Sequence, residues 1–341
     1  MRSFSSRPGS LDGRAILVTG GTGSFGQRFA RHVLTQHNLS RLVIFSRDEM
    51  KQYESAQLMS EREYPALRYF IGDVRDRERL EMAMRGIDTV IHAAALKHVP
   101  AAEYNPFECI HTNVMGSENV VRAALNAGVR TVLALSTDKA VSPANLYGAS
   151  KLAAERIFVA ANNVAGHGAT RYAIVRYGNV VGSRGSVVPL FQRLIRDGAT
   201  SLPITDSRMT RFWITLDQGV DFVVSSLEMM QGGEIFVPKI PSMRVADLAT
   251  AMAPSLKHEN VGIRPGEKLH ESLVTVDEAR HTLETEDRFI VEPSFSFWRR
   301  TAKAYRDARK VGEDFAYTSD NNSEWLDIPA MREMLSTSGI A

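Results

Sequence analysis

The sequence predicts an α/β protein: a doubly wound parallel sheet followed by a smaller α/β domain. Three observations support this class. Short apolar runs alternate with helical patterns over the first half of the 341 residues. A glycine-rich turn joins the first apolar run to the first helical pattern. After Tyr177 the apolar runs become shorter, and Pro and Gly become frequent. Such alternation is typical of parallel sheets that carry helices on both faces.

The expected strands are nearly continuous apolar runs, as in sheets that are covered on both faces. They lie at residues 15–19, 41–46, 67–71, 89–93, 131–136 and 172–176. Helical patterns fill the gaps, at residues 26–35, 49–63, 77–84, 113–127 and 145–162. Shorter strands are expected at residues 202–205 and 234–238. We place the sheet domain at residues 1–178 and the smaller domain mainly at 179–341, with segments at about 205–240 returning to the sheet.

Bulk composition argues against several classes of function. The 41 basic and 39 acidic residues leave a net charge of +2, which gives no case for nucleic-acid binding or for a polybasic membrane patch. No apolar run approaches the roughly 18 residues of a spanning helix, and residues 1–14 contain no apolar signal segment. Cys109 is the only cysteine, so no intrachain disulfide can form. We expect a cytoplasmic protein with about ten disordered leading residues.

The turn after the first strand, TGGTGSFG at residues 19–26, fits a dinucleotide-binding Rossmann domain. Glycines at its first, middle and last positions permit a tight turn, close approach of backbone N–H groups to a pyrophosphate, and close packing of the helix on the sheet. A plain glycine-rich turn is the other interpretation. The cofactor-binding residues expected here are Gly20, Thr22, Gly23, Ser24, Phe25 and Gly26.

The end of the second strand indicates which dinucleotide binds. Ser46 and Arg47 stand where NAD-selective sites usually have a carboxylate, and Lys51 follows one helical turn later. Because Arg and Lys suit a 2′-phosphate, the sequence favours NADP over NAD. Asp48 complicates this prediction, and capping of the next helix is its simpler role. Weaker cofactor candidates follow the third and fourth strands: Asp73, Val74, Ala93 and Ala94.

Two pairs of titratable residues lie near the end of the fifth strand, one where the strand ends and one on the helix that follows. Tyr147 and Lys151 are four residues apart, which places both on one face of a helix. A nearby ammonium lowers the pKa of a tyrosine and makes it a usable base. Asp138 and Lys139 end the preceding strand, where a simple Tyr-Lys dehydrogenase usually needs only Ser or Thr. They imply extra proton transfers, with Lys139 as a base if its pKa is depressed and Asp138 as a donor if its pKa is raised. A solvent-exposed Asp-Lys pair is the alternative.

Further motifs, spread over about residues 12–330, connect the sequence to a known family. They are SRDE at 46–49, AALKHVP at 94–100, STDKA at 136–140, RYGNV at 176–180, SRGSV at 183–187, ITD at 204–206, MTRF at 209–212 and RPGEK at 264–268. With the glycine turn and the Tyr-Lys pair, they are similar to those of the inverting UDP-N-acetylglucosamine 4,6-dehydratases, in the extended short-chain dehydrogenase/reductase superfamily. NPFEC at 105–109 and NLYG at 145–148 favour the branch that serves pseudaminic acid biosynthesis.

The resemblance implies a complete reaction on UDP-N-acetylglucosamine with a tightly bound, recycled NADP. Tyr147 takes the 4-OH proton while hydride passes from C4 to NADP, and Lys139 then removes the C5 hydrogen. Asp138 helps the C6 hydroxyl to leave as water, hydride returns to C6, and C5 is reprotonated on its opposite face. The implied product is UDP-2-acetamido-2,6-dideoxy-β-L-arabino-hex-4-ulose, in the first step of pseudaminic acid biosynthesis. Flagellin or a surface polysaccharide is the expected final acceptor.

The resemblance also implies contacts with the sugar nucleotide. Arg264 suits the diphosphate, Glu267 the ribose hydroxyls, and residues 189–191 the uracil. The expected substrate-binding residues are Lys97, Asn179, Pro189, Phe191, Thr205, Arg264 and Glu267, and Tyr147, Lys151 and Val180 are expected to contact the cofactor. The family also implies a homo-oligomer, a dimer or a hexamer. No metal is expected, because the histidines lack ligand spacing.

Two other classes of function stay open at this point. The first is a related UDP-sugar enzyme, either a C4 epimerase or a retaining dehydratase. An epimerase leaves Asp138 and Lys139 unexplained, and a retaining dehydratase usually has an acidic pair at their positions. The second is a non-catalytic NADP-sensing protein on the same fold, although such proteins typically lose the Tyr-Lys pair.

Overall fold

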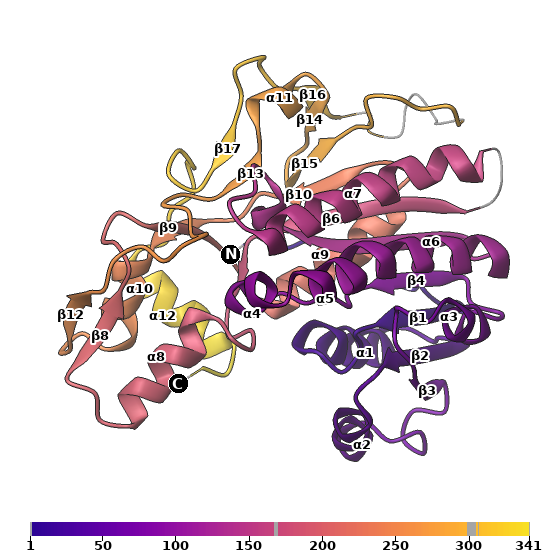
Figure 1. The fold of residues 1–341 in the computed structure, drawn as a ribbon, viewed down its shortest axis with the longest axis horizontal. Coiled ribbons are helices and arrows are strands. Elements are labelled where there is room, and N and C mark those ends of the chain that lie inside the picture. The colour runs from indigo at the N-terminus through magenta and orange to yellow at the C-terminus, as the bar shows by residue number, and fades with distance from the viewer. Residues whose placement is uncertain (1, 167–169, 299–304, 306, 341) are drawn as a thin grey trace.

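The computed structural model describes residues 2–166, 170–298, 305 and 307–340. Its largest element is a ten-stranded sheet with the strand order β16-β14-β15-β10-β6-β5-β4-β1-β2-β3 (Figure 1). Neighbouring strands from β10 to β3 all pair in parallel. These strands are β1 (Ala15–Thr19), β2 (Arg41–Ser46), β3 (Leu67–Ile71), β4 (Thr89–His92), β5 (Thr131–Thr137), β6 (Arg171–Tyr177) and β10 (Ile235–Pro238). The predicted doubly wound sheet is confirmed.

Two helical layers cover this sheet. In one layer α6 (Gly116–Ala127) packs between α3 (Arg77–Ala83) and α7 (Leu146–Ala165), and in the other α1 (Ser24–Gln36) packs against α9 (Leu216–Met229) (Figure 1). Right-handed crossovers put the two layers on opposite faces, because the strand order reverses between β1 and β4. All five residues of β1 are consequently buried. Helix α2 (Glu49–Leu58) ends before the predicted residue 63.

The chain beyond residue 178 contributes more to the main sheet than was expected. Besides β10, it adds the antiparallel strands β15 (Arg288–Val291), β14 (Thr282–Glu284) and β16 (Arg309–Lys310). The start of the chain also belongs to the main core, since Phe4 and Leu11 are buried there. The expectation of a disordered beginning was therefore wrong for these residues. The domain boundary at residue 178 stays a prediction.

The remaining segments surround a second hydrophobic core, built from α8 (Val187–Arg196), α10 (Val245–Met252) and α12 (Ile328–Thr337) with neighbouring strands. One small sheet has the order β11-β9-β7 and two others pair β12 with β8 and β13 with β17. Their bounds are β7 (Asn179–Val180), β8 (Ser201–Ile204), β9 (Thr210–Ile214), β11 (Ser242–Arg244), β12 (Lys257–Asn260), β13 (Ser272–Val274) and β17 (Tyr317–Thr318).

A buried arginine joins the two parts of the chain next to the carboxyl end of the sheet. Arg176, on β6, lies 2.7 Å from Glu155 on α7 and 3.0 Å from Glu278 on α11 (Val276–Ala279). It also donates to the Leu273 carbonyl at 2.8 Å. Buried charges need such complete pairing, because an unpaired charge in the interior is costly. The network holds α7, the helix that carries Tyr147, against segments from the second half of the chain.

Candidate active site

A cavity of about 800 Å³ lies at the carboxyl ends of the parallel strands. It runs from the glycine turn after β1 to the segment that follows β6. Ligands of open α/β sheets bind at this edge, where the strand order reverses. Most of the predicted site residues line it: Gly20, Thr22, Gly23, Ser24, Phe25, Gly26, Ser46, Arg47, Lys51, Asp73, Val74, Ala93, Ala94, Lys97, Lys139, Tyr147, Lys151, Asn179 and Val180.

The glycine turn leaves room for a pyrophosphate against the backbone. Gly20 has φ +66°, and a Cβ on it would lie 2.8 Å from the Ala94 nitrogen, so a side chain would be both strained and blocked. Gly23 precedes α1, and no side chain caps the N–H groups of this helix. Those uncapped N–H groups and the positive end of the helix dipole suit an anionic ligand. The residues present therefore fit a dinucleotide.

Next to this turn, two cationic and two acidic side chains lie together at the end of β2. Asp48 caps α2, accepting from the Lys51 backbone at 3.0 Å, and its other oxygen pairs with the Lys51 ammonium at 3.0 Å. These bonds lower the pKa of Asp48. Its predicted role as a helix cap is confirmed, so this carboxylate is already engaged. Arg47 has a half-exposed side chain, 3.7 Å from Asp73.

Helix α7 begins at Leu146, so Tyr147 stands in its first turn and Lys151 in the next. Asn145 caps the helix by accepting from the Gly148 nitrogen at 2.8 Å. The Lys151 ammonium donates to the Leu135 carbonyl at 2.7 Å, and burial lowers its pKa to about 8.

The pKa of Tyr147 differs from the sequence-based expectation. Burial raises it to about 12, and the Lys139 charge and the Thr137 hydroxyl offset that rise only in part. The expected lowering by Lys151 was therefore wrong, because burial outweighs the charges around the phenol. The cation that favours the phenolate here is Lys139.

Asp138 and Lys139 form an ion pair in which the aspartate is fully buried and the lysine side chain is 28% exposed. The Asp138 side chain is fully buried, and its Oδ1 accepts from the Thr137 hydroxyl at 2.8 Å and from the Lys139 ammonium at 3.1 Å. Its Oδ2 has no hydrogen-bond partner among the described residues. Burial raises the pKa of Asp138 even though Lys139 opposes the rise. This is the direction that a proton donor requires.

Lys139 departs from its expected pKa. Burial alone would lower the pKa, but the carboxylates of Asp138 and Glu271 outweigh burial and raise it above the ordinary value for lysine. The condition on which Lys139 was expected to act as a base, a depressed pKa, is therefore not met in the unliganded site. The sequence pattern contained no sign of the second carboxylate.

Three buried polar atoms on the cavity wall have no hydrogen-bond partner within the described chain: Thr112 Oγ1, Ser136 Oγ and Asn179 Oδ1. Buried polar groups almost always have partners, so these three mark places where a ligand would supply them. The sequence singled out Asn179. It gave Thr112 no role, because none of the motifs included this residue.

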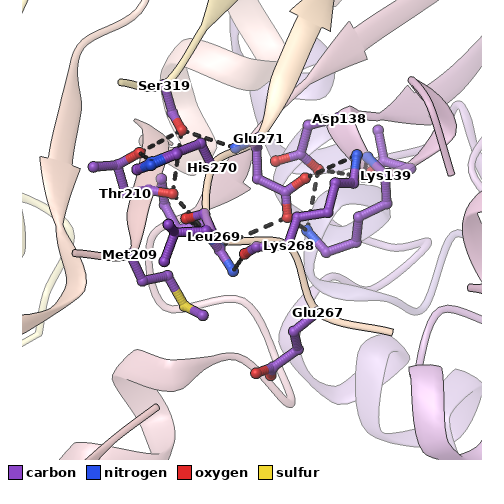
Figure 2. A network of polar contacts seen from close by, with 12 residues as sticks. Asp138, Lys139, Met209, Thr210, Glu267, Lys268, Leu269, His270, Glu271 and Ser319 are labelled. Atoms are coloured by element: carbon purple, nitrogen blue, oxygen red, sulfur yellow. Dashed lines mark hydrogen bonds and ion pairs between the residues drawn. The ribbon is translucent and has the colours of Figure 1, made fainter. Parts of the chain in front are cut away.

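A group that sequence reasoning missed lies directly behind Lys139 (Figure 2). The Lys139 ammonium lies 3.5 Å from Glu271 Oε1, and the Lys268 ammonium lies 3.4 Å from Glu271 Oε2. Lys268 also donates to the Val141 carbonyl at 2.7 Å. The motif RPGEK ends at Lys268, but nothing in it pointed to Glu271 three residues further on.

Other predicted substrate residues are not among those that line the cavity: Pro189, Phe191, Thr205, Arg264 and Glu267. Phe191 is fully buried in the second core, so the expectation that it lines a pocket is not met. Arg264 is exposed, and its backbone donates to the Glu267 carboxylate at 3.3 Å. The Asn145 amide reaches the nearby Gly266 carbonyl at 2.8 Å, which attaches this turn to the start of α7.

Within residues 2–166, 170–298, 305 and 307–340, no group of three His, Cys, Asp or Glu side chains is placed to hold a metal ion. No helix in the described part of the chain is long and apolar enough to cross a membrane.

Comparisons with known sequences agree with this geometry. Residues 16–293 match a family described as polysaccharide biosynthesis protein. A Campylobacter jejuni protein named UDP-N-acetylglucosamine 4,6-dehydratase (inverting) is 54% identical over 325 residues, which cover 94% of this chain and 96% of that protein. A Rickettsia conorii protein named UDP-glucose 4-epimerase is 38% identical over 331 residues, covering 95% and 96%.

Solved structures show the same fold. The X-ray structure of Pen from Bacillus thuringiensis is similar with a TM-score of 0.89 at 35% identity, over 97% of this chain and all 100% of that one. The dTDP-glucose 4,6-dehydratase DesIV from Streptomyces venezuelae, solved with NAD bound, has a TM-score of 0.67 at 24% identity over 75% and 86% of the two chains. These matches confirm the resemblance seen in the sequence. The chain belongs to the polysaccharide biosynthesis protein family of the extended short-chain dehydrogenase/reductase superfamily.

Proposed function

We propose that this chain is a C5-inverting UDP-N-acetylglucosamine 4,6-dehydratase, a hydro-lyase that uses a tightly bound NADP. The observation that carries the proposal is the ion pair between the buried Asp138 and Lys139; Lys139 and Tyr147 both line the dinucleotide cavity. Tyr147 and Lys151 suffice for oxidation and reduction at C4. Removal of water needs a base for C5 and an acid for the C6 hydroxyl as well. The pair supplies one of each.

The first step is proton removal from the 4-OH group by Tyr147. When bound, the nicotinamide supplies the reversible hydride acceptance that allows C4 to be oxidised and C6 to be reduced later. Lys139 and the Thr137 hydroxyl both favour the Tyr147 phenolate, although burial opposes them. The Lys139 ammonium is thus useful before C5 chemistry begins.

A single proton transfer then prepares both groups for elimination. Moving a proton from Lys139 to Asp138, across 3.1 Å, turns the ion pair into a neutral amine and a carboxylic acid. Burial favours the neutral forms, because charges in the interior are poorly solvated. The amine removes the C5 proton, and the acid gives its proton to the C6 oxygen as the C–O bond breaks and water leaves. The ion pair is restored by these two transfers.

Other residues on or near the cavity wall are assigned to binding of the substrate and the cofactor. Asn179, Ser136 and Thr112 present polar atoms that lack partners among the described residues, and we assign them to the sugar and the cofactor. Lys97 also lines the cavity, and burial lowers its pKa. Arg264 and Glu267 are proposed to hold the diphosphate and the ribose from the adjoining turn.

Incubation with UDP-N-acetylglucosamine in D₂O tests the proposal. We expect loss of one water molecule by mass spectrometry, deuterium at C5 by NMR, and the β-L-arabino 4-keto product, which we propose to be the product of the first step of pseudaminic acid biosynthesis. The 38% identical relative named as an epimerase makes C4 epimerisation the second candidate. An unchanged mass together with a C4 epimer would favour it, and cofactor binding without turnover would favour a sensing protein.

Arg47 provides a test of cofactor choice. Its half-exposed guanidinium stands beside the cavity at the end of β2, so we propose that it binds the 2′-phosphate of NADP. Arg47→Ala is expected to weaken NADP binding about 10- to 100-fold, because a charged hydrogen bond contributes about 1.5–3 kcal/mol. NAD binding should change by less than about threefold.

Fluorescence titration of the cofactor-free protein with both dinucleotides measures these affinities. Arg85→Ala, at an exposed position away from the cavity lining, is the matched control. Equal losses of affinity for NADP and NAD would contradict the assignment of Arg47.

A further inference from the structure

Glu271 is a buried acid to which the proposed reaction assigns no role. Its side chain is 2% exposed and lies just before β13. Ser319 fixes its backbone on both sides: the Glu271 nitrogen donates to Ser319 Oγ at 2.9 Å, and the Ser319 nitrogen donates to the Glu271 carbonyl at 2.7 Å. The carboxylate is thereby held in one place, pointing toward Asp138 and Lys139 (Figure 2).

Three cations surround this carboxylate. Oε1 lies 3.5 Å from the Lys139 ammonium and 3.7 Å from Arg211 Nε, and Oε2 lies 3.4 Å from the Lys268 ammonium. Arg211 also donates to the carbonyls of Thr210, Leu269 and Lys268, and Lys268 to that of Val141. Lys139 has no such carbonyl contacts among the described residues. Within the described chain its ammonium pairs with Asp138 and Glu271.

The order of proton transfers explains why Lys139 needs a second carboxylate. Once Lys139 has taken the C5 proton, and before the C6 oxygen has received one, Asp138 is still a neutral acid. At that moment Lys139 is an ammonium whose nearest carboxyl group carries no charge. Glu271, 3.5 Å away and held as an anion by Arg211 and Lys268, is the remaining counter-charge.

We propose that Glu271 is a positioning residue for Lys139: its carboxylate holds the lysine at the cavity wall and balances its charge while Asp138 carries a proton. The inference rests on the proposed function, because it concerns the base of that reaction. Two titratable groups from the first half of the chain also interact with Lys139. The Tyr147 phenolate would raise the pKa of Lys139, and the Lys139 charge lowers the pKa of Lys97. Glu271, Arg211 and Lys268 face it from the second half of the chain.

Acetylation of Lys139 by acetic anhydride tests this without substrate. Only the neutral amine reacts, so well below its pKa a lysine labels at a rate that rises tenfold for each unit by which the pKa falls. Glu271→Gln removes the charge and keeps the size of the side chain. At pH 9 we expect Lys139 of this variant to label about tenfold faster or more than in the wild type, as measured by peptide mass spectrometry.

Two further variants separate charge from structure. Glu271→Asp keeps an anion, so its Lys139 rate should stay within about threefold of the wild type. Lys268→Met removes a competing cation and should slow Lys139 labelling. Exposed Lys257 normalises the rates, and buried Lys151 reports any loosening of the fold.

Three results would overturn the proposal. Glu271→Gln could leave the labelling rate of Lys139 unchanged, or Glu271→Asp could raise that rate as much as Glu271→Gln does. Lys151 could also label faster by the same factor as Lys139. Faster labelling of Lys139 in the Lys268→Met variant would overturn it too. Failure of the wild type to dehydrate UDP-N-acetylglucosamine would instead remove the proposed function, and the labelling would still decide whether Glu271 controls Lys139.

Discussion

Replacing Lys139 with methionine is expected to lower the kcat for dehydration by about 10²- to 10⁴-fold, the usual contribution of a general base. Methionine keeps an unbranched side chain of similar length but cannot accept the C5 proton. Oxidation at C4, which we assign to Tyr147, should continue more slowly, because Lys139 no longer favours the phenolate. Reduced cofactor should therefore accumulate without dehydrated sugar. Cofactor fluorescence and mass spectrometry of the sugar nucleotide measure the two steps separately.

The raised pKa of Lys139 makes this variant informative. An ammonium with a pKa above the ordinary lysine value loses its proton to water only rarely near neutral pH. The base must therefore be generated inside the site, by transfer to Asp138. Lys257→Met, an exposed change on β12, should leave both steps unchanged. Dehydration by Lys139→Met at a tenth of the wild-type rate or faster would show that another group removes the C5 proton.

The fold was predictable where one physical rule dominates. The inner strands β1, β2, β4, β5 and β6 are largely apolar because helices cover both faces of the sheet, and the turn around Gly20 needs glycine because a Cβ would meet Ala94. The antiparallel extension was not predictable. Its outer strand β16 is the exposed pair Arg309–Lys310, which carries no hydrophobic pattern. Only pairing with β14 makes it a strand.

Some residues of the candidate site could likewise be predicted from the sequence and others could not. Local spacing was enough to bring Tyr147, Lys151 and Lys139 to one cavity, because strand ends and helix starts meet at one edge of the sheet. It was not enough for Phe191, because an apolar residue on α8 fits either a core or a pocket lining.

The electrostatics of Lys139 were likewise beyond local spacing. Its pKa is raised first by Asp138 and next by Glu271, which is remote in sequence and reaches Lys139 only through the packing of β13. Charge partners of this kind leave no periodic pattern in a sequence, so only the folded chain reveals them.

Replacing Tyr147 with phenylalanine is expected to stop the reaction one step earlier, lowering the rate of C4 oxidation by about 10²- to 10⁴-fold. The ring can keep its packing with Ala102 and Cys109, so the loss should not come from unfolding. Tyr53→Phe, at an exposed position on α2, is the matched control and should oxidise C4 at the wild-type rate.

The two active-site variants should differ in what they accumulate. Tyr147→Phe should form neither reduced cofactor nor dehydrated sugar, whereas Lys139→Met should form the first without the second. Because the pKa of Tyr147 is raised to about 12, the phenolate is scarce near neutral pH, and the phenol must lose its own proton before it can accept the one from the 4-OH group. Rapid formation of reduced cofactor by Tyr147→Phe would assign the C4 proton to another acceptor, and Lys139 would then be the first group to test.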